Sequence, residues 1–273
     1  MAVTKVKKLA FINGKGGCGK TTSIFHVSGV LSKGGSRVLV VDLDKQRNTT
    51  ETLLMNTTIP AVTVYDVMCS GAEPRTATAS ALFQRRGNAN PRYYGVDCMV
   101  SDERLEDEAS LNKIDATRFG EALDGFLAAK CYDWLLVDMP PSSKALNDIC
   151  FCNVVDYLIV PFTSDFFSIQ GYGDLITTVQ RARVSNPKLN NLGVYLSRYM
   201  PNCSLDRAVR NMLMEGFSKT FIDVQIPLAA DIREAVAYGR PISYYREISK
   251  SRRAYESLVG EIVRRIESTE RQD

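Results

Sequence analysis

The amino-acid sequence predicts an α/β fold in which a doubly wound, mostly parallel sheet is flanked by helices. Short apolar runs alternate with longer helical stretches along the whole chain. Most of these runs are continuously apolar, as expected for strands that are covered on both faces. The first run leads into a glycine-rich segment that opens a helical stretch from Thr21 to Lys33. These three observations together favour an open sheet with helices on both sides.

Seven apolar runs are predicted to form the strands of this sheet. They are Leu9–Asn13, Val38–Asp42, Gly95–Val100, Trp134–Asp138, Tyr157–Phe162, Leu192–Ser197 and Phe221–Ile226. The segment from Ser70 to Arg92 carries glycine and proline with little periodicity, and we expect it to form a long surface excursion. Because no repeat or linker interrupts the pattern, residues 1–273 are expected to form a single domain.

The composition is that of an ordinary globular protein, with 45% hydrophobic and 24% charged residues. No apolar run approaches the roughly 20 residues of a transmembrane helix, and the N-terminus lacks the apolar segment of a signal peptide. We therefore expect a cytoplasmic protein without a membrane partner. Seven cysteines without a CxxC pair and a single histidine favour reduced, mostly buried thiols over a zinc site.

The net charge of +3 is too small to indicate a nucleic-acid partner, but its distribution is uneven. Lys and Arg outnumber Asp and Glu from Arg181 to Asp273, whereas the stretch from Val100 to Asp115 is acidic. A basic C-terminal third is either a face that contacts phosphates or a solvated helical surface. Charge alone leaves both interpretations open.

The segment from Gly14 to Thr21 fits the P-loop pattern G-x-x-x-x-G-K-[ST] between a predicted strand and a predicted helix. Its glycines allow backbone N–H groups to surround phosphate oxygens, and the helix N-terminus adds partial positive charge. Lys20 is expected to reach the β- and γ-phosphates of ATP, and the Thr21 hydroxyl is expected to bind Mg²⁺. The predicted nucleotide-binding residues of this loop are Gly14, Lys15, Gly16, Gly17, Cys18, Gly19, Lys20, Thr21 and Thr22.

Cys18 fills a variable position of the loop, where its small size is sufficient reason for its presence. A second interpretation is that the electropositive loop lowers the pKa of its thiol and makes it oxidisable.

Two further strands end in carboxylates, at the edge of a parallel sheet where ligands bind. The apolar run that begins at Val38 ends in Asp42, and Asp44 follows two residues later. The run from Trp134 to Val137 ends in Asp138, which has the pattern of a Walker B aspartate and is expected to hold Mg²⁺ through water.

The segment from Lys15 to Thr22 carries a second lysine, and it resembles the deviant Walker A motif of the ParA/MinD family of ATPases. The resemblance implies that Lys15 reaches the nucleotide held by a partner subunit in an ATP-bound homodimer. An ammonium there would neutralise charge that develops on the phosphates, so Lys15, Lys20 and Asp44 are the candidate catalytic residues.

The segment that begins at Asp42 is similar to the family pattern D-x-D-P-Q-G-N. Asp42, Asp44, Gln46 and Asn48 match, whereas Lys45 replaces the proline and Arg47 replaces the glycine. The family assigns the Asp44 position to the attacking water; a turn or helix-cap role is the alternative. Lys45 and Arg47 are expected to add positive charge beside the phosphates or the dimer interface.

The resemblance extends over nearly the whole chain. The pattern D-x-P-P-S is intact from Asp138 to Ser142, and Pro227 corresponds to a proline near the adenine in the family. No cysteine lies between Met139 and Asn147, which argues against the iron–sulfur members. The apolar stripe Leu258, Val259, Ile262, Val263 and Ile266 is interpreted as packing on the sheet, and not as a membrane helix of the MinD type.

The P-loop begins close to the first residue, which is similar to the small, Soj-type ParA proteins. The resemblance then implies an ATP-dependent homodimer that binds DNA without sequence preference on the nucleoid, and a ParB-like partner that stimulates slow ATP hydrolysis. The candidate DNA contacts are Arg233, Lys250, Arg252 and Arg253, with a wider set of Arg198, Arg207, Arg210, Lys219 and Arg240. The alternative is a MinD-like or cargo-positioning ATPase that acts on a protein assembly or a membrane partner.

Overall fold

A computed structural model describes residues 5–84, 90–141, 143–164 and 166–271 of the chain. Its centre is an eight-stranded sheet with the strand order β3-β4-β2-β5-β1-β6-β7-β8. Every neighbouring pair is parallel except β3 and β4. The strands are β1 (Lys7–Phe11), β2 (Val38–Asp42), β3 (Thr78–Phe83), β4 (Arg92–Met99), β5 (Trp134–Asp138), β6 (Tyr157–Phe162), β7 (Asn190–Tyr199) and β8 (Phe221–Pro227).

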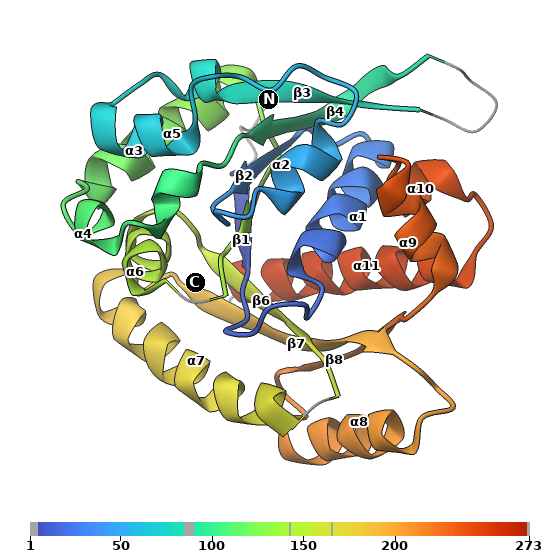
Figure 1. The fold of residues 1–273 in the computed structure, drawn as a ribbon. Coiled ribbons are helices and arrows are strands. Elements are labelled where there is room, and N and C mark those ends of the chain that lie inside the picture. The colour runs from blue at the N-terminus through green and yellow to red at the C-terminus, as the bar shows by residue number, and fades with distance from the viewer. Residues whose placement is uncertain (1–4, 85–89, 142, 165, 272–273) are drawn as a thin grey trace.

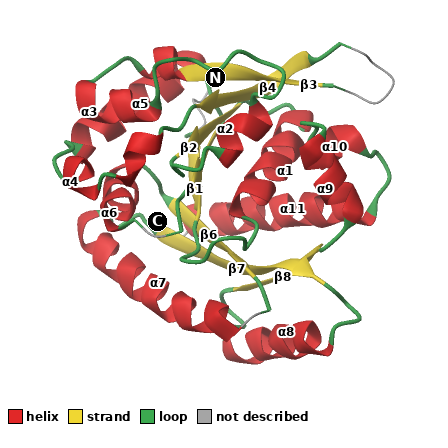
Figure 2. Ribbon diagram, viewed as in Figure 1, coloured by secondary structure: helices red, strands yellow, loops and turns green. Residues whose placement is uncertain are grey.

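Helices cover both faces of the sheet, which confirms the predicted fold class (Figure 1 and Figure 2). One face carries α1 (Lys20–Lys33), α9 (Ala230–Ala237), α10 (Ile242–Tyr245) and α11 (Lys250–Glu270). The opposite face carries α3 (Val64–Ser70), α5 (Ala116–Lys130), α6 (Lys144–Asn153) and α7 (Phe166–Ser185). The remaining helices are α2 (Asn48–Leu53), α4 (Glu108–Leu111) and α8 (Ser204–Gly216), with 3₁₀ turns at Pro74–Ala77 and Glu103–Glu106.

The prediction of a surface excursion from Ser70 to Arg92 is wrong for most of that segment. It contains a 3₁₀ turn and then β3, which pairs with β4 at the edge of the sheet; residues 85–89 lie outside the described part. Residues of β3 differ in burial along the strand, and Thr78 and Ser80 interrupt its apolar residues. Buried parallel strands have continuous apolar runs, whereas this half-covered antiparallel edge strand does not.

The apolar stripe of α11 packs on the sheet, as predicted. Leu258, Ile262 and Ile266 are at most 1% exposed and belong to the same hydrophobic cluster as residues of α1 and β1. Within the described residues, no helix has the length and apolarity needed to cross a membrane.

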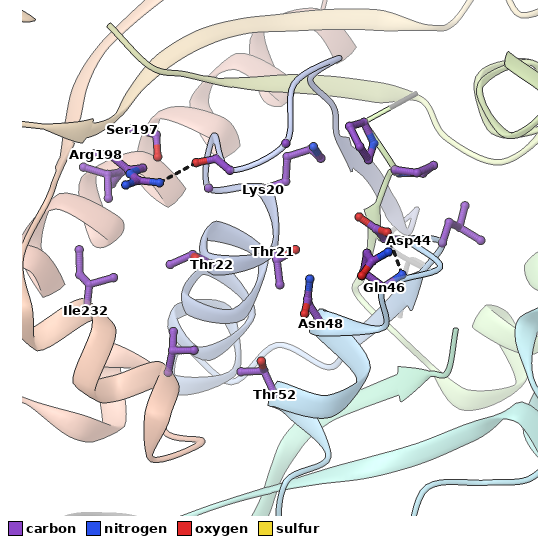
Figure 3. Close-up of a pocket in the computed structure, with 18 of the residues that line it drawn as sticks. Lys20, Thr21, Thr22, Asp44, Gln46, Asn48, Thr52, Ser197, Arg198 and Ile232 are labelled. Atoms are coloured by element: carbon purple, nitrogen blue, oxygen red, sulfur yellow. Dashed lines mark hydrogen bonds between the residues drawn. The ribbon is translucent and has the colours of Figure 1, made fainter. Parts of the chain in front are cut away.

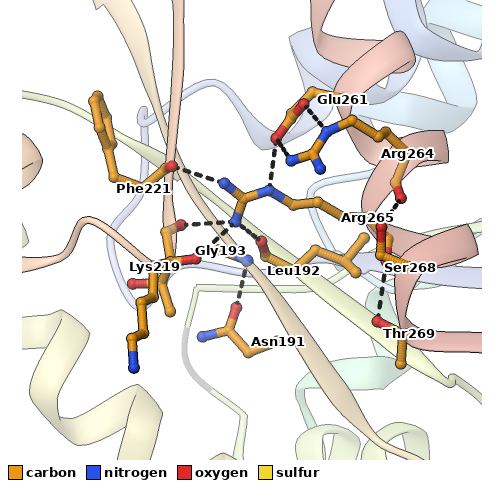
Figure 4. Close-up of polar contacts among 11 residues, drawn as sticks. Asn191, Leu192, Gly193, Lys219, Phe221, Glu261, Arg264, Arg265, Ser268 and Thr269 are labelled. Atoms are coloured by element: carbon orange, nitrogen blue, oxygen red, sulfur yellow. Dashed lines mark hydrogen bonds and ion pairs between the residues drawn. The ribbon is translucent and has the colours of Figure 1, made fainter. Parts of the chain in front are cut away.

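Arg265 joins the C-terminal half of α11 to the sheet through hydrogen bonds (Figure 4). Its guanidinium donates to the carbonyls of Leu192 at 2.6 Å and Phe221 at 2.8 Å, and its Nε donates to Glu261 at 2.8 Å. The backbone of Gly193 is left-handed there, with φ +125°, and a Cβ at this position would come within 1.8 Å of the Thr220 carbonyl oxygen. The arginine therefore satisfies carbonyls where the close approach of β7 and β8 leaves no room for a side chain.

The helix that follows the P-loop, α1, packs tightly against α10 and α11. The fully buried His26 accepts a hydrogen bond at Nδ1 from the Ile242 amide at 3.0 Å, and its ring lies 4.7 Å from that of Tyr255. Burial lowers the pKa of His26 to about 3, so the ring is neutral at physiological pH. One turn further along α1, a Cβ on Gly29 would meet the Pro241 ring at 2.2 Å. The start of α10 therefore rests directly on the backbone of α1.

This packing predicts opposite effects for two glycine-to-alanine changes in helices. Gly29→Ala should destabilise the fold by about 2 kcal/mol, because the new methyl group has no space against Pro241. Gly260→Ala in α11 has nothing within 4 Å of its Cβ, and it should stabilise the fold by about 0.5–1 kcal/mol through helix propensity. Urea unfolding of both variants measures the difference; equal stabilities would contradict the close contact at Gly29.

Candidate functional site

A cavity of about 880 Å³ lies at the carboxyl ends of the parallel strands (Figure 3). This volume is within the usual range for small-molecule sites. One wall is the loop between β1 and α1, a second is the segment after β2, and a third comes from the ends of β7 and β8 with α9. The lining residues with polar or charged side chains include Lys20, Thr21, Thr22, Asp44, Lys45, Gln46, Asn48, Thr52, Glu106, Glu108, Ser143, Ser197, Arg198 and Arg233.

The predicted P-loop has the geometry of a phosphate cradle. Gly17 and Gly19 adopt left-handed φ angles of +77° and +92°, and a Cβ on Gly19 would come within 2.5 Å of the Ser197 hydroxyl. The buried ammonium of Lys20 donates to the carbonyls of Asn13 and Lys15, each at 3.2 Å, which holds it inside the loop. No described side chain caps the N-terminus of α1, so its first N–H groups are available to an anion.

Oxygen ligands suitable for Mg²⁺ meet beside this loop. The hydroxyl of Thr21 donates to Oδ2 of Asp138 at 2.7 Å, and the hydroxyl of Thr49 donates to the same oxygen at 2.6 Å. Oδ1 of Asp138 is buried and has no hydrogen-bond partner among the described residues. A buried carboxylate oxygen beside a threonine hydroxyl fits a hard cation, which would take its other ligands from water and phosphate. The described residues contain no cluster of three His, Cys, Asp or Glu side chains that could hold a metal ion.

Two buried carboxylates end β2 and β5 in register, because Asp42 pairs with Asp138 across the two strands. Burial raises the pKa of each of them, and for Asp42 the neighbouring charge of Asp138 raises it further. Oδ2 of Asp42 accepts hydrogen bonds from the Thr50 amide at 2.8 Å and the Thr50 hydroxyl at 2.7 Å, and Oδ1 accepts from the Asp44 amide. Asp42 therefore holds the loop that follows it; neither Asp42 nor Asp138 is among the residues that line the cavity.

Asp44 lines the cavity and is fixed from several directions. Its Oδ1 accepts a hydrogen bond from the Gln46 amide at 3.0 Å, and its carbonyl accepts one from the buried Ser101 hydroxyl at 2.7 Å. The alternative predicted for Asp44, a turn residue, is thus present in the structure; the helix cap is Arg47 instead. Oδ2 of Asp44 has no hydrogen-bond partner in the described part of the chain, so one oxygen remains for another role.

The two residues that depart from the family pattern, Lys45 and Arg47, differ in their position relative to the cavity. Lys45 lines the cavity and forms an ion pair with Glu106, which comes from the acidic stretch. Arg47 does not line the cavity, and its backbone has the left-handed φ of +57° that glycine adopts most easily. The loop thus keeps the conformation of a glycine at a position where this chain has arginine.

Lys15 and Cys18 lie close together in the loop, where the Cys18 thiol donates to the Lys15 carbonyl at 3.3 Å. Lys15 is half-buried and lies outside the lining of this cavity, as does Gly14; its amide donates to the Asn13 side chain at 2.9 Å. Cys18 is buried, and burial raises the pKa of its thiol. The interpretation of Cys18 as an activated thiol is therefore wrong, because desolvation outweighs the charge of Lys20.

The C-terminal wall of the cavity is largely apolar. It is formed by Ile226, Pro227, Leu228, Ile232, Val236 and Tyr255. Pro227, expected near an adenine, is therefore in the wall, and an aromatic base suits such a surface. Ser142, the last residue of the D-x-P-P-S pattern, lies outside the described residues, whereas Pro140 and Pro141 line the cavity.

The cations predicted to contact DNA do not form one group. Arg233 lines the cavity, and so does Arg198 of the wider set. Lys250 and Arg253 are exposed at the start of α11, whereas Arg252 is paired with Glu256 at 2.8 Å. Arg210 is paired with Asp223 at 2.6 Å, and Arg240 is hydrogen-bonded to Gln84. Of the first set, Arg233, Lys250 and Arg253 are therefore exposed, whereas Arg252 is held in an ion pair.

Several residues of the site escaped prediction. Thr49, Thr50 and Ser101 hold the carboxylates and their loop, and Arg198, expected only as a DNA contact, meets the P-loop. They come from segments without a motif of their own, so only the folded chain brings them to the site.

Fold and site together define a P-loop ATPase. A family model described as an AAA domain matches residues 6–191. The chromosome partitioning protein ParA of Caulobacter vibrioides is 30% identical over 269 residues, which cover 97% of both chains. The chromosome-partitioning ATPase Soj of Treponema pallidum is 30% identical over 266 residues, which cover 95% of this chain and 98% of its own.

A similar crystal structure is that of cobyrinic acid a,c-diamide synthase from Mycobacterium smegmatis with bound ADP and magnesium. It has a TM-score of 0.77 and 23% identity, and the match covers 97% of this chain and 96% of that one. At this identity the likeness concerns the fold. The chain belongs to the AAA-domain family that the model defines and, within it, to the ParA/MinD ATPases.

Proposed function

We propose that this protein is a ParA-type partition ATPase that binds Mg²⁺ and ATP in the cavity. The observation that carries the proposal is the meeting of Lys20, Thr21 and Asp138 at the mouth of an uncapped helix, beside an apolar wall. The P-loop amides and Lys20 bind the phosphates, Thr21 and Asp138 hold Mg²⁺, and the adenine lies near Pro227. The magnesium ion supplies Lewis-acid charge to the phosphates.

Hydrolysis in this proposal is carried by groups around the γ-phosphate. The free oxygen of Asp44 orients the attacking water, while Lys20 stabilises the charge that develops on the phosphates. Support comes from the fixed position of Asp44, whose backbone and Oδ1 are hydrogen-bonded to neighbours. The slow intrinsic turnover leaves time for a state in which ATP is bound and intact.

ATP binding is proposed to bring two subunits together as a homodimer. Lys15, outside its own cavity, then contacts the nucleotide of the partner subunit. The dimer binds DNA of any sequence through Lys250 and Arg253, with contributions from Arg233 and Arg252, and associates with the nucleoid. A ParB-like partner accelerates hydrolysis and so releases the DNA, which segregates or positions plasmid or chromosomal DNA.

ATP binding and ATP hydrolysis, the two functions proposed for the cavity residues, are tested separately by Lys20→Ala and Asp44→Asn. Lys20→Ala should abolish ATP binding in isothermal titration, because the main counter-charge of the phosphates is lost.

Asp44→Asn keeps an oxygen for the Gln46 amide and removes only the charge, so it should bind ATP and hydrolyse it about 10² to 10⁴ times more slowly. Normal turnover in Asp44→Asn would leave Asp44 as a turn residue.

Lys15→Ala should bind ATP as a monomer with nearly unchanged affinity but should not form the ATP-dependent dimer or hydrolyse ATP normally. The reason is that Lys15 lies outside the cavity of its own subunit. Sedimentation velocity with ATP and with ADP measures the dimer. A variant that dimerises and turns over like the wild type would show that Lys15 serves only its own loop.

Lys250→Ala/Arg253→Ala should weaken DNA binding for all sequences alike while ATP-dependent dimerisation persists. Removal of each cation that binds a phosphate should reduce the slope of log affinity against log salt by about 0.9. The control is Arg264→Ala/Arg271→Ala, which removes the same charge from the other end of α11. Gel-shift titrations over a salt series measure the slopes.

If both double variants keep the wild-type slope, the DNA-binding surface lies elsewhere on the dimer. If the wild-type protein with ATP does not bind DNA at low salt, the partition function is wrong. The MinD-like or cargo-positioning switch, which acts on a protein assembly or a membrane partner, then takes its place.

A further inference from the structure

Arg198 has a backbone conformation that arginine rarely adopts. It lies at the end of β7 with a φ of +58°, in the left-handed region. Three described residues other than glycine have a positive φ, namely Arg47, Cys131 and Arg198, and of these only Arg198 lines the cavity. The conformation is strained for any residue with a Cβ, and such strain is concentrated at functional sites.

From this backbone position, the guanidinium of Arg198 contacts the P-loop. Nη1 of Arg198 donates a hydrogen bond of 2.9 Å to the carbonyl oxygen of Gly17, as Figure 3 shows. The side chain thus joins β7 to a loop that lies 181 residues earlier in the sequence. An exposed arginine side chain has many other conformations available, and this contact orders it on the P-loop.

The contact determines which way one peptide group of the loop points. No peptide bond in the described residues is cis, and in a trans peptide the carbonyl of Gly17 and the N–H of Cys18 point in opposite directions. With the carbonyl held by Arg198, the N–H of Cys18 is directed to the other side of the loop. Gly17 has a φ of +77°, and glycine reaches both signs of φ at little cost, so this peptide can reverse unless something holds it.

We propose that Arg198 is a positioning residue that keeps the Gly17–Cys18 peptide in its anion-binding orientation, with the carbonyl turned to the guanidinium and the N–H toward the phosphates. The inference rests on the proposed function as an ATP-binding protein. A reversed peptide presents a carbonyl oxygen to the phosphates where the held peptide presents a donor. The apparent affinity for a nucleotide then falls with the fraction of molecules in the correct orientation.

This role differs from a direct contact between Arg198 and the nucleotide base. A guanidinium that touches the base affects the preference between adenine and guanine. A guanidinium that acts through the P-loop changes the binding of every nucleotide with a phosphate at that loop by the same factor. The two roles are therefore distinguished by comparing ATP with GTP.

The experiment measures ATP and GTP affinities by isothermal titration, with Mg²⁺, for the wild type and Arg198→Ala, Arg198→Lys and Arg198→Gly. The loss of one charge-assisted hydrogen bond should weaken ATP binding by about tenfold in Arg198→Ala. Arg198→Lys retains a donor and should recover part of the affinity. The control is Arg264→Ala, which removes an exposed arginine paired with Glu261 and should bind as the wild type does.

Thermal unfolding of the nucleotide-free variants separates positioning from general stability. Glycine removes the strain at a φ of +58°, so Arg198→Gly should be at least as stable as Arg198→Ala while binding ATP equally poorly. Loss of affinity without loss of stability, and by the same factor for ATP and GTP, supports the proposal.

Unchanged ATP affinity in Arg198→Ala overturns the proposal and leaves the proposed function intact. A changed ratio of ATP to GTP affinity also overturns it, because Arg198 then contacts the base. A fall in affinity that follows the fall in stability shows a merely structural role. If the wild type binds neither nucleotide, the proposed function fails, and this inference fails with it.

Discussion

The site depends on the burial of two carboxylates next to each other at the ends of β2 and β5. Asp42 and Asp138 are both fully buried and paired in register. Buried charges of the same sign are costly unless donors compensate them, and here the donors come from the next helices. Thr50 of α2 serves Asp42, while Thr49 of α2 and Thr21 of α1 serve Asp138. The carboxylates thus fix two strands and two helices around the P-loop.

This arrangement also explains why the compensation is complete at one carboxylate and incomplete at the other. Both oxygens of Asp42 accept hydrogen bonds, which suits a group that shapes a loop. Oδ1 of Asp138 is buried without a partner in the described residues, which suits a group that meets a cation. The ammonium of Lys20 lowers the cost of charge at Asp138. The unpaired Oδ1 of Asp138 therefore indicates a binding role, whereas the hydrogen-bonded oxygens of Asp42 indicate a structural one.

The sequence was sufficient for features whose residues are adjacent in the chain. The P-loop, the strands that end in Asp42 and Asp138, and the stripe of α11 combine local pattern with local geometry, and each was predicted. β3 was not, because half-covered edge strands lack a continuous apolar run. Nor were the places of Thr49, Ser101 and Arg198 in the site, which depend on which strand ends meet. The second interpretation of Cys18, a thiol with a lowered pKa, is wrong because a sequence gives its charged neighbours and not its burial.

The cavity and the exposed cations of α11 belong to one packed unit. Ile232 of α9 and Tyr255 of α11 both line the cavity, and the buried Ser251 hydroxyl at the start of α11 donates to Asp231 of α9 at 2.6 Å. The ring of Tyr255 also packs at a tilt against that of His26 in α1, the helix that begins at the P-loop. Lys250 precedes Ser251 and Arg253 follows it by two residues, so the backbone of both cations belongs to the first turn of α11, which Ser251 joins to α9. The cavity wall and the first turn of α11 are therefore joined by continuous packing, which is the physical connection that a link between nucleotide state and charge presentation requires.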